Sequence, residues 1–480
     1  MSTESPLRRM VGGFAVLSAA TLLAQVLGFI LLTVAARRLG PGPIGSFSFA
    51  VSLVGYFAIP ANFGVTALAI RDISRDPASV RQVMGEVIVL HAGLVALPYV
   101  LVVLAAPLLG ADELSSRLIP VVALGFILEA AALAWVLVGR QRFGILAVGR
   151  VAGALVNFVL VLLLIEPGAG DTGAFEFAWA GVAGLAVAGV VTLVPVLRRE
   201  GRPALVLDRR RLAGRFKTGV PLGIAAVMVS IYYSLDSVML GYLRTTEDVG
   251  QYAVAYRLPL ALIGFAGLWG SVLFPHASAL AARDPEALRG QLGFFTSVAA
   301  VVALPIGVGA VLVGSELMPQ LFGAEFAPAG TPFVILAWAA AIVVFTISTG
   351  FVALALGEER HYLIAVTAGA VGNFLANLVL IPTAGMTGAA SATVGAEVIV
   401  FALIWRRLHA RLGPVPLEWW RILRAAVATF AMVPVLIALD GTLSAAVRVA
   451  IGALVFAVAA VALGAVHRGE IRAALRVGGG

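Results

Sequence analysis

The sequence predicts an all-α polytopic membrane protein of about fourteen transmembrane helices. Hydrophobic residues make up 61% of the 480 residues and charged residues only 12%, far outside the composition of soluble domains. Stretches of about 20 apolar residues, the length that crosses the hydrocarbon of a bilayer, recur along the chain with short polar segments between them. A bilayer accepts apolar surface on every side of a helix bundle, so we expect lipid around most of this chain.

The first and the thirteenth predicted helices need separate arguments. The N-terminal sequence MSTESPLRRM runs directly into a long uncharged segment without a small-residue cleavage site, so we expect an uncleaved first helix. The thirteenth helix is short for a crossing, and Trp419 and Trp420 at an interface, or snorkelling arginines, would have to extend it. The predicted spans, in order, are 11–36, 44–70, 87–109, 118–138, 143–165, 177–197, 218–242, 249–274, 292–314, 331–356, 362–381, 387–405, 425–439 and 448–466.

The net charge of +8 is carried almost entirely by arginine, and the arginines are unevenly placed. With a cytoplasmic N-terminus most of them fall in cytoplasmic segments, as the positive-inside rule requires, and both termini are cytoplasmic. The largest basic block, 198–217, joins the sixth and seventh helices. We interpret it as a topology anchor and linker, with binding of anionic lipid headgroups as the alternative. This placement argues against nucleic acid as a partner.

Two halves of the chain repeat each other in the same order, at a spacing of about 210 residues. The best match follows the fifth and the eleventh predicted helices, and weaker matches lie in other loops. The matched segments are 167–174 (PGAGDTGA) with 382–389 (PTAGMTGA), 44–50 (IGSFSFA) with 249–255 (VGQYAVA), and 109–112 (LGAD) with 322–325 (FGAE).

Each copy of the repeat contains six helices, so both copies begin and end on the same side of the membrane and form parallel lobes. We expect substrate to bind between the lobes, which rock about a central cavity. The predicted parts are an N-lobe at 1–197, the basic linker at 198–217, a C-lobe at 218–405, and two further helices with a cytoplasmic tail at 406–480.

Three segments resemble the bacterial oligosaccharide flippase, or polysaccharide export, family of the multidrug/oligosaccharidyl-lipid/polysaccharide superfamily. They are RRLGPGPIGSFSFAVSLVGYF within 37–76, SLDSVMLGYLRTTEDVGQYAVAYRL at 234–258 and LMPQLFGAEFAPA at 317–329. The likeness extends over roughly residues 10 to 405. It implies a two-lobed fold like that of the multidrug and toxic compound extrusion (MATE) transporters, with a cation-lined cavity between the lobes.

The resemblance also implies a function. A member of this family moves an undecaprenyl-pyrophosphate-linked oligosaccharide from the inner to the outer leaflet of the bacterial plasma membrane, for surface polysaccharide biosynthesis. The implied partners are this lipid-linked glycan and membrane lipids. A glycan polymerase and glycosyltransferases are further candidate partners. We expect no enzyme activity and no bound cofactor, with H⁺ or Na⁺ as candidate coupling ions.

Ionisable residues inside predicted helices are candidates for the substrate site, because a charge in hydrocarbon is costly. Glu129 and Arg150 lie at similar depth in the fourth and fifth helices, and Asp236 and Arg257 do so in the seventh and eighth. One interpretation is two buried structural ion pairs. The other is that the arginines bind pyrophosphate while the carboxylates exchange partners with them during the cycle.

Other candidates lie nearer the ends of helices. Arg71 at the inner mouth would recruit an anionic headgroup, or act only as a topology signal. Tyr256 would stack on a sugar ring, or belong to an interfacial aromatic belt. His91 and Glu86 are candidates for proton coupling, although such residues more often reach the interface.

Three alternative functions stay open. An ion-coupled exporter of small cationic compounds would use the same two lobes, and a carboxylate-lined cavity would favour it. Lipid II flippases usually carry an arginine in the first helix, and 11–36 contains none. A membrane-embedded glycan polymerase needs a catalytic constellation on a substantial loop, which the short outside loops do not offer. The sequence contains no cysteine, so thiolate metal sites and thiol nucleophiles are excluded.

Overall fold

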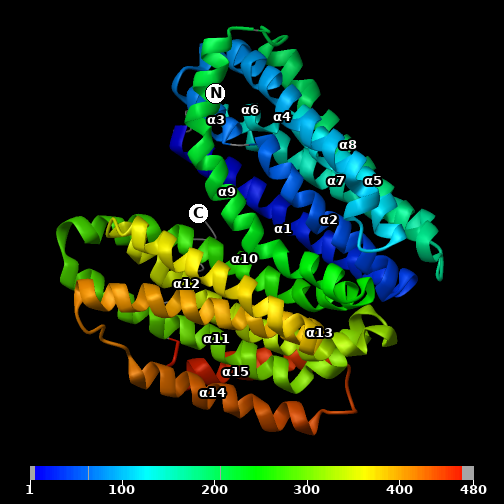
Figure 1. The fold of residues 1–480 in the computed structure, drawn as a ribbon. Coiled ribbons are helices and arrows are strands. Elements are labelled where there is room, and N and C mark those ends of the chain that lie inside the picture. The colour runs from blue at the N-terminus through cyan, green and yellow to red at the C-terminus, as the bar shows by residue number, and fades with distance from the viewer. Residues whose placement is uncertain (1–5, 63, 206, 467–480) are drawn as a thin grey trace. The chain divides into compact units, whose positions relative to one another are not determined.

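The computed structural model describes residues 6–62, 64–205 and 207–466, and all regular secondary structure in these residues is helical, with no strand (Figure 1). Short polar or glycine-containing segments separate the helices. The α-helices are α1 Pro6–Leu39, α2 Pro41–Asn62, α3 Val65–Arg75, α4 Val80–Leu109, α5 Glu113–Ala131, α6 Ala134–Gly139, α7 Phe143–Leu164, α8 Gly170–Glu200, α9 Arg209–Leu243, α10 Thr246–Arg283, α11 Pro285–Phe322, α12 Gly330–Ala355, α13 Glu359–Leu412, α14 Trp419–Ala438 and α15 Ala445–Ala462.

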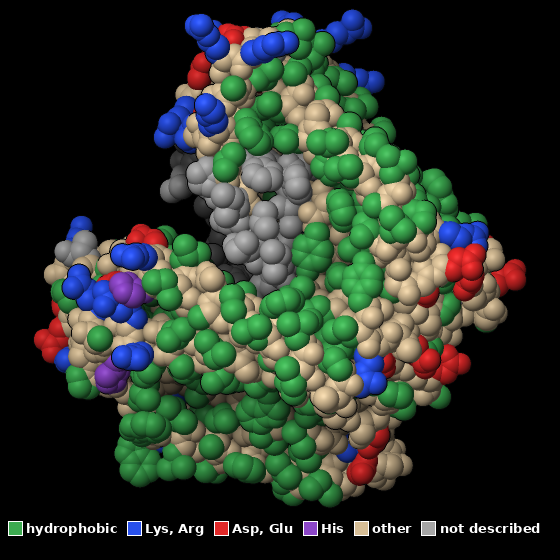
Figure 2. All heavy atoms as spheres, in the orientation of Figure 1, with side chains coloured by type: hydrophobic (Ala, Val, Ile, Leu, Met, Phe, Trp, Pro, Cys, Tyr) green, Lys and Arg blue, Asp and Glu red, His purple; other side chains and the backbone are tan. Residues whose placement is uncertain are grey.

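Ten segments of the described chain are long and apolar enough to cross a membrane. Large apolar side chains on them are exposed, among them Leu108 and Leu163, as expected of a surface that faces lipid. Figure 2 shows hydrophobic side chains over much of the visible face, with the Lys and Arg side chains mainly at its margins. The chain is therefore a multi-pass all-α membrane protein, as predicted. The number fourteen stays a prediction.

Two of the predicted spans are broken in the structure. The span 44–70 divides into α2 and α3 around Gly64, whose φ of 69° lies in the left-handed region that glycine tolerates. The span 118–138 divides into α5 and α6 around Leu133, which has a φ of 49° although it is not glycine. Composition did not reveal these breaks, because neither span contains a polar segment long enough to mark a loop.

Contacts between helices divide the chain into two compact units, Met1–Gly250 and Gln251–Gly480. In the first unit α7 packs against α1 and α8, and α5 packs against α2, α4 and α8. The first unit also includes α9, which packs against α2. The predicted lobe boundaries at 197 and 218 stay a prediction, since this division follows contacts rather than the repeat.

In the second unit α11, α12 and α13 pack in sequence, and α14 and α15 pack together against α11 (Figure 1). α14 begins at Trp419, which supplies the extension that the short thirteenth span needed. Arg448 of α15 is only 2% exposed and forms ion pairs with Glu316 of α11 and Asp440. A buried arginine of this kind needs its partners, so the pairs fix α15 to α11.

The internal repeat is visible in the backbone. Gly170 begins α8 with a φ of 54°, and the matching Gly385 interrupts α13 with a φ of 55°. α13 is therefore two helices joined at a bend, and they correspond to the eleventh and twelfth predicted spans. Both copies use glycine at this point because the left-handed conformation is costly for residues with a Cβ.

Candidate functional site

The predicted pair of Glu129 and Arg150 does not form between these two described side chains. Arg150 of α7 instead donates a hydrogen bond from Nη1 to Thr21 Oγ1 of α1, at 2.6 Å. Sequence gives the depth of a residue in its helix and not the direction in which it points, and in this structure Arg150 points toward α1. α7 packs against α1 and α8, whereas Glu129 lies on α5, which packs against α2, α4 and α8.

Glu129 lines a cavity of about 160 Å³ inside the first unit. His91 of α4 and Trp135 of α6 line the same cavity, and both side chains are buried. The two ring nitrogens of His91 have no hydrogen-bond partner, and the indole nitrogen of Trp135 has none either. The cavity therefore joins a carboxylate, an imidazole and an indole N–H in one small space.

Asp236 and Arg257 lie in different units, so their predicted pairing stays a prediction. Asp236 is a buried residue of α9, and its charge acts on Tyr56 of α2. Arg257 of α10 is half-buried in the second unit. Tyr256 beside it stacks on the buried Tyr252, with ring centroids 5.9 Å apart. Stacking of Tyr256 on a sugar also stays a prediction.

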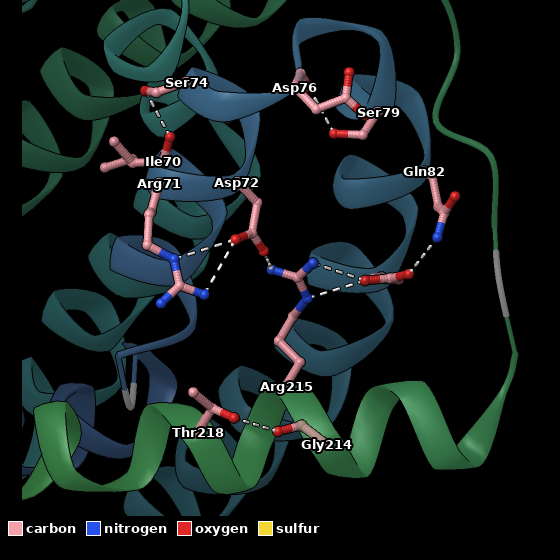
Figure 3. A network of polar contacts seen from close by, with 11 residues as sticks. Ile70, Arg71, Asp72, Ser74, Asp76, Ser79, Gln82, Gly214, Arg215 and Thr218 are labelled. Atoms are coloured by element: carbon pink, nitrogen blue, oxygen red, sulfur yellow. Dashed lines mark hydrogen bonds and ion pairs between the residues drawn. The ribbon is translucent and has the colours of Figure 1, made fainter.

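Arg71 belongs to a network of charged residues at the predicted inner ends of α3, α4 and α9 (Figure 3). Its Nε and Nη2 donate to Asp72 Oδ1 at 3.3 and 3.2 Å. The other carboxylate oxygen of Asp72 forms an ion pair with Arg215 of α9, at 3.0 Å. Arg215 also pairs with Glu86 of α4 at 2.9 Å, and Gln82 donates to the second oxygen of Glu86.

Arg215 is the residue of this network that sequence reasoning missed. It belongs to the basic block 198–217, which we interpreted as a linker, yet its side chain is only 11% exposed and lies between two carboxylates. Asp208 caps the N-terminus of α9 and so starts the helix within the block. The sequence did contain one signal: Asp72 on α3 and Glu86 on α4 are two acidic residues that require a cation as partner.

A second polar cluster lies at the predicted outer ends of α2, α5 and α10, and we call it the outer contact: Gly45, Ser46, Asp112, Thr246 and Gly250. A Cβ on Gly45 would lie 1.6 Å from the carbonyl oxygen of Thr246, and one on Gly250 would lie 2.0 Å from that of Pro41. The two glycines occupy matching positions of the repeat. The two matching turns therefore pack against each other within the first unit, each glycine against the backbone of the other turn.

Asp112 holds the outer contact together. Its Oδ2 accepts hydrogen bonds from Ser46 Oγ at 2.6 Å and from Thr246 Oγ1 at 2.8 Å. Its Oδ1 accepts from the backbone N–H of Ser115 and so caps α5. Burial alone would raise the pKa of Asp112, but the hydrogen bonds from Ser46, Ser115 and Thr246 outweigh burial and lower it.

The second copy of the repeat has a related contact. Gln251, which matches Ser46, donates from Nε2 to the backbone oxygen of Glu325, which matches Asp112, at 2.7 Å. No group of three His, Asp or Glu side chains suited to a metal ion occurs among the described residues. Among the polar sites that the structure describes are thus a charged network at the predicted inner end, a cavity within the first unit, and the contact at the predicted outer end.

Comparison with known proteins indicates the class of protein to which this chain belongs. The model of the family described as polysaccharide biosynthesis protein matches residues 10–281. The probable low-salt glycan biosynthesis flippase Agl15 of Haloferax volcanii is 25% identical over 377 residues, which cover 78% of each chain. The probable flippase AglR of the same organism is 30% identical over 192 residues, covering 38% of this chain and 40% of AglR.

Solved structures share the fold. The lipid II flippase MurJ, in an inward closed conformation, matches with a TM-score of 0.76 and 14% identity, over 92% of this chain and 97% of MurJ. An inward-facing multidrug resistance transporter of the MATE family matches with a TM-score of 0.61 and 19% identity, over 83% of this chain and 98% of that one.

Fold and relatives together define a flippase-type transporter of the multidrug/oligosaccharidyl-lipid/polysaccharide superfamily, and not an enzyme. Within that superfamily, the chain belongs to the polysaccharide biosynthesis protein family. Both conclusions agree with the resemblance found in the sequence.

Proposed function

We propose that this protein moves an undecaprenyl-pyrophosphate-linked oligosaccharide from the inner to the outer leaflet of a bacterial plasma membrane, with both termini in the cytoplasm. The observation that carries the proposal is the family match over residues 10–281, joined to a flippase-named relative that aligns over 78% of both chains. The product then feeds glycan polymerases and glycosyltransferases that build surface polysaccharide.

The arginines of the helices supply the chemistry for a pyrophosphate. A guanidinium presents five N–H donors in a planar fork that fits phosphate oxygens. Arg150 is exposed and uses Nη1 for Thr21, so other donors of its fork can meet an anion. Arg257 and Arg71 are the further cations that we assign to the headgroup, Asp236 and Glu129 are the exchanging carboxylates, and Tyr256 stacks on sugar.

The outer contact supports alternating access. Transport from the inner leaflet requires that the outer side be closed while cargo enters from within. Close packing of Gly45 and Gly250 within the first unit, fastened by Asp112, joins matching turns of the repeat, and we assign the outer closure to this contact. Release of cargo on the outside then requires these few contacts to separate, which is a small and reversible change.

A reconstitution experiment tests the proposal. Purified protein is placed in vesicles with fluorescent undecaprenyl-pyrophosphate oligosaccharide, and loss of leaflet asymmetry is measured with an impermeant quencher. We expect acceleration over empty vesicles for at least one glycan. Acceleration for none, including the precursor of the host, would refute the proposal, and transport of small organic cations alone would favour the exporter.

Arg257→Gln provides the site-specific test. We expect loss of most leaflet transfer with near-normal membrane abundance, because the cation that holds pyrophosphate is removed. The matched control is Arg360→Gln, since Arg360 is an exposed arginine at the end of a helix. Full activity of Arg257→Gln would contradict the assignment, and equal losses in both variants would remove its specificity.

A further inference from the structure

The cavity beside Glu129 is built from five helices of the first unit and lies where two of the predicted spans are broken. Its volume of about 160 Å³ is far above the roughly 10–15 Å³ that one water molecule needs. Thr66 follows the break at Gly64, and Trp135 follows the break at Leu133. The lining residues are Ala58 of α2, Thr66 of α3, His91 of α4, Phe126, Glu129 and Ala130 of α5, and Ala134 and Trp135 of α6.

The polar atoms of the cavity lack partners. His91 is only 8% exposed, and neither Nδ1 nor Nε2 makes a hydrogen bond; Trp135 is 6% exposed, and its Nε1 makes none. Buried polar atoms in proteins are nearly always paired, with protein groups or with ordered water. Three such atoms at one polar cavity therefore point to a small polar ligand there.

The charged groups around His91 indicate which ligand the cavity binds. Among the described residues, Glu129 is the only other titratable residue that lines the cavity, and it contributes a carboxylate. On its other side His91 lines a cavity whose residues from α5, α8 and the segment before α9 are all apolar. No cation faces the imidazole from the described residues that line either cavity. A carboxylate that lines the same cavity can serve as the counter-ion when the imidazole takes up a proton.

Other ligands fit less well. A metal ion needs more side-chain ligands than one imidazole and one carboxylate, and the described residues offer no group of three. A sugar ring needs an open aromatic face to stack on, whereas Trp135 is buried. A proton, carried by water in the cavity, needs only the groups that are present.

We propose that this cavity is a proton-binding site, in which His91 takes up a proton and Glu129 is the counter-ion. The protonated imidazole has two donors and the neutral one has a donor and an acceptor, so protonation rearranges the hydrogen bonds between α4, α5 and α6. Because the cavity lies at the breaks after α2 and α5, this rearrangement acts on segments that already depart from straight helices. Coupling of the cycle to a proton gradient rests, in addition, on the proposed function.

Tryptophan fluorescence tests the site without any substrate, because a protonated histidine quenches a neighbouring indole. The purified protein in lipid nanodiscs is titrated from pH 4 to 9, and the signal of Trp135 is the difference between wild type and Trp135→Phe. We expect a quenching transition that is lost in His91→Asn. In Glu129→Gln we expect its midpoint to move to lower pH by about one unit, because the counter-ion is gone.

A matched control is available in the second unit. The ring of His409 lies 5.9 Å from that of Trp405, so His409→Asn should remove a separate transition and leave the Trp135 signal unchanged. Absence of a Trp135 transition, or its survival in His91→Asn, overturns the site. His91→Gln is the second variant, for the case that His91→Asn does not reach the membrane.

Leaflet transfer in vesicles with a pH gradient tests the coupling. We expect the gradient to change the rate of the wild type and to leave His91→Asn unaffected. A wild type that transports equally with and without the gradient overturns coupling. A wild type that moves no cargo but keeps the Trp135 transition overturns the proposed function and supports the site.

Discussion

The outer contact allows a prediction whose size follows from the structure. In Gly45→Ala the new Cβ would lie 1.6 Å from the carbonyl oxygen of Thr246, while an ordinary contact begins near 3.4 Å. The obstacle is backbone and cannot rotate away, so α2 and the start of α10 must separate by roughly 2 Å. Overpacking of this kind costs about 1–3 kcal/mol.

This cost falls only on the closed arrangement, so Gly45→Ala shifts the equilibrium toward an open outer side. At about 1.4 kcal/mol for each factor of ten, the open population rises roughly 5- to 150-fold. Gly250→Ala should act in the same way, because a Cβ there meets the carbonyl oxygen of Pro41.

Cysteine labelling measures this shift. The natural chain contains no cysteine, and Ala50, about one turn beyond the glycine on α2, is fully buried. In Ala50→Cys, an impermeant maleimide applied to whole cells should react slowly, and Gly45→Ala should accelerate the reaction. Gly55→Ala is the matched control, because a Cβ at Gly55 meets nothing within 4 Å. Equal labelling rates in all three backgrounds would refute the reasoning.

Two further predictions concern charges outside the hydrocarbon. The lowered pKa of Asp112 means that its contribution to the outer contact is present above the ordinary aspartate pKa and lost only as the pH falls through the lowered value. Maleimide reacts with the thiolate, so the labelling rate of Ala50→Cys is divided at each pH by that of an exposed cysteine. This ratio should be constant between pH 5 and 8, and Asp112→Asn should raise it throughout that range; a rise of the ratio in the parent alone near pH 6 would contradict this. Arg215→Gln leaves Glu86 without its cation and Asp72 with Arg71 alone, and we expect a loss of about 3 kcal/mol, read as a lower midpoint of thermal unfolding. Arg211→Gln should change the midpoint little, because Arg211 is 58% exposed and pairs only with nearby Asp208.

Composition and repeat predicted most of the architecture, whereas the contacts of single side chains largely escaped prediction. Apolar length and arginine placement are properties of whole segments, and lipid imposes them on every helix. The break at Leu133 left no such trace, since the left-handed residue there is an ordinary apolar one. The direction of Arg150 depends on which neighbour α7 packs against, which no pattern within α7 encodes.

The difference between patterns of whole segments and contacts of single side chains also explains why the surroundings of Arg215 and His91 were not predicted. Arg215 stands among many arginines, and only the fold shows that it alone lies between Asp72 and Glu86. His91 was a lone histidine on an apolar helix, for which reaching the interface was the common interpretation. The structure buries it beside a cavity instead, because α5 and α6 break at Leu133 and bring Trp135 and Glu129 to the same space.

The two copies of the repeat use one contact geometry with different chemistry. Ser46 donates to the side-chain carboxylate of Asp112, while its counterpart Gln251 donates to the backbone oxygen of Glu325. Only the first arrangement also reaches Thr246, the residue against which Gly45 packs. A backbone acceptor cannot be removed by protonation or substitution, whereas a carboxylate can. The outer contact therefore depends on the first copy for its strength, so a change at Asp112 should weaken it more than any change in the side chain of Glu325.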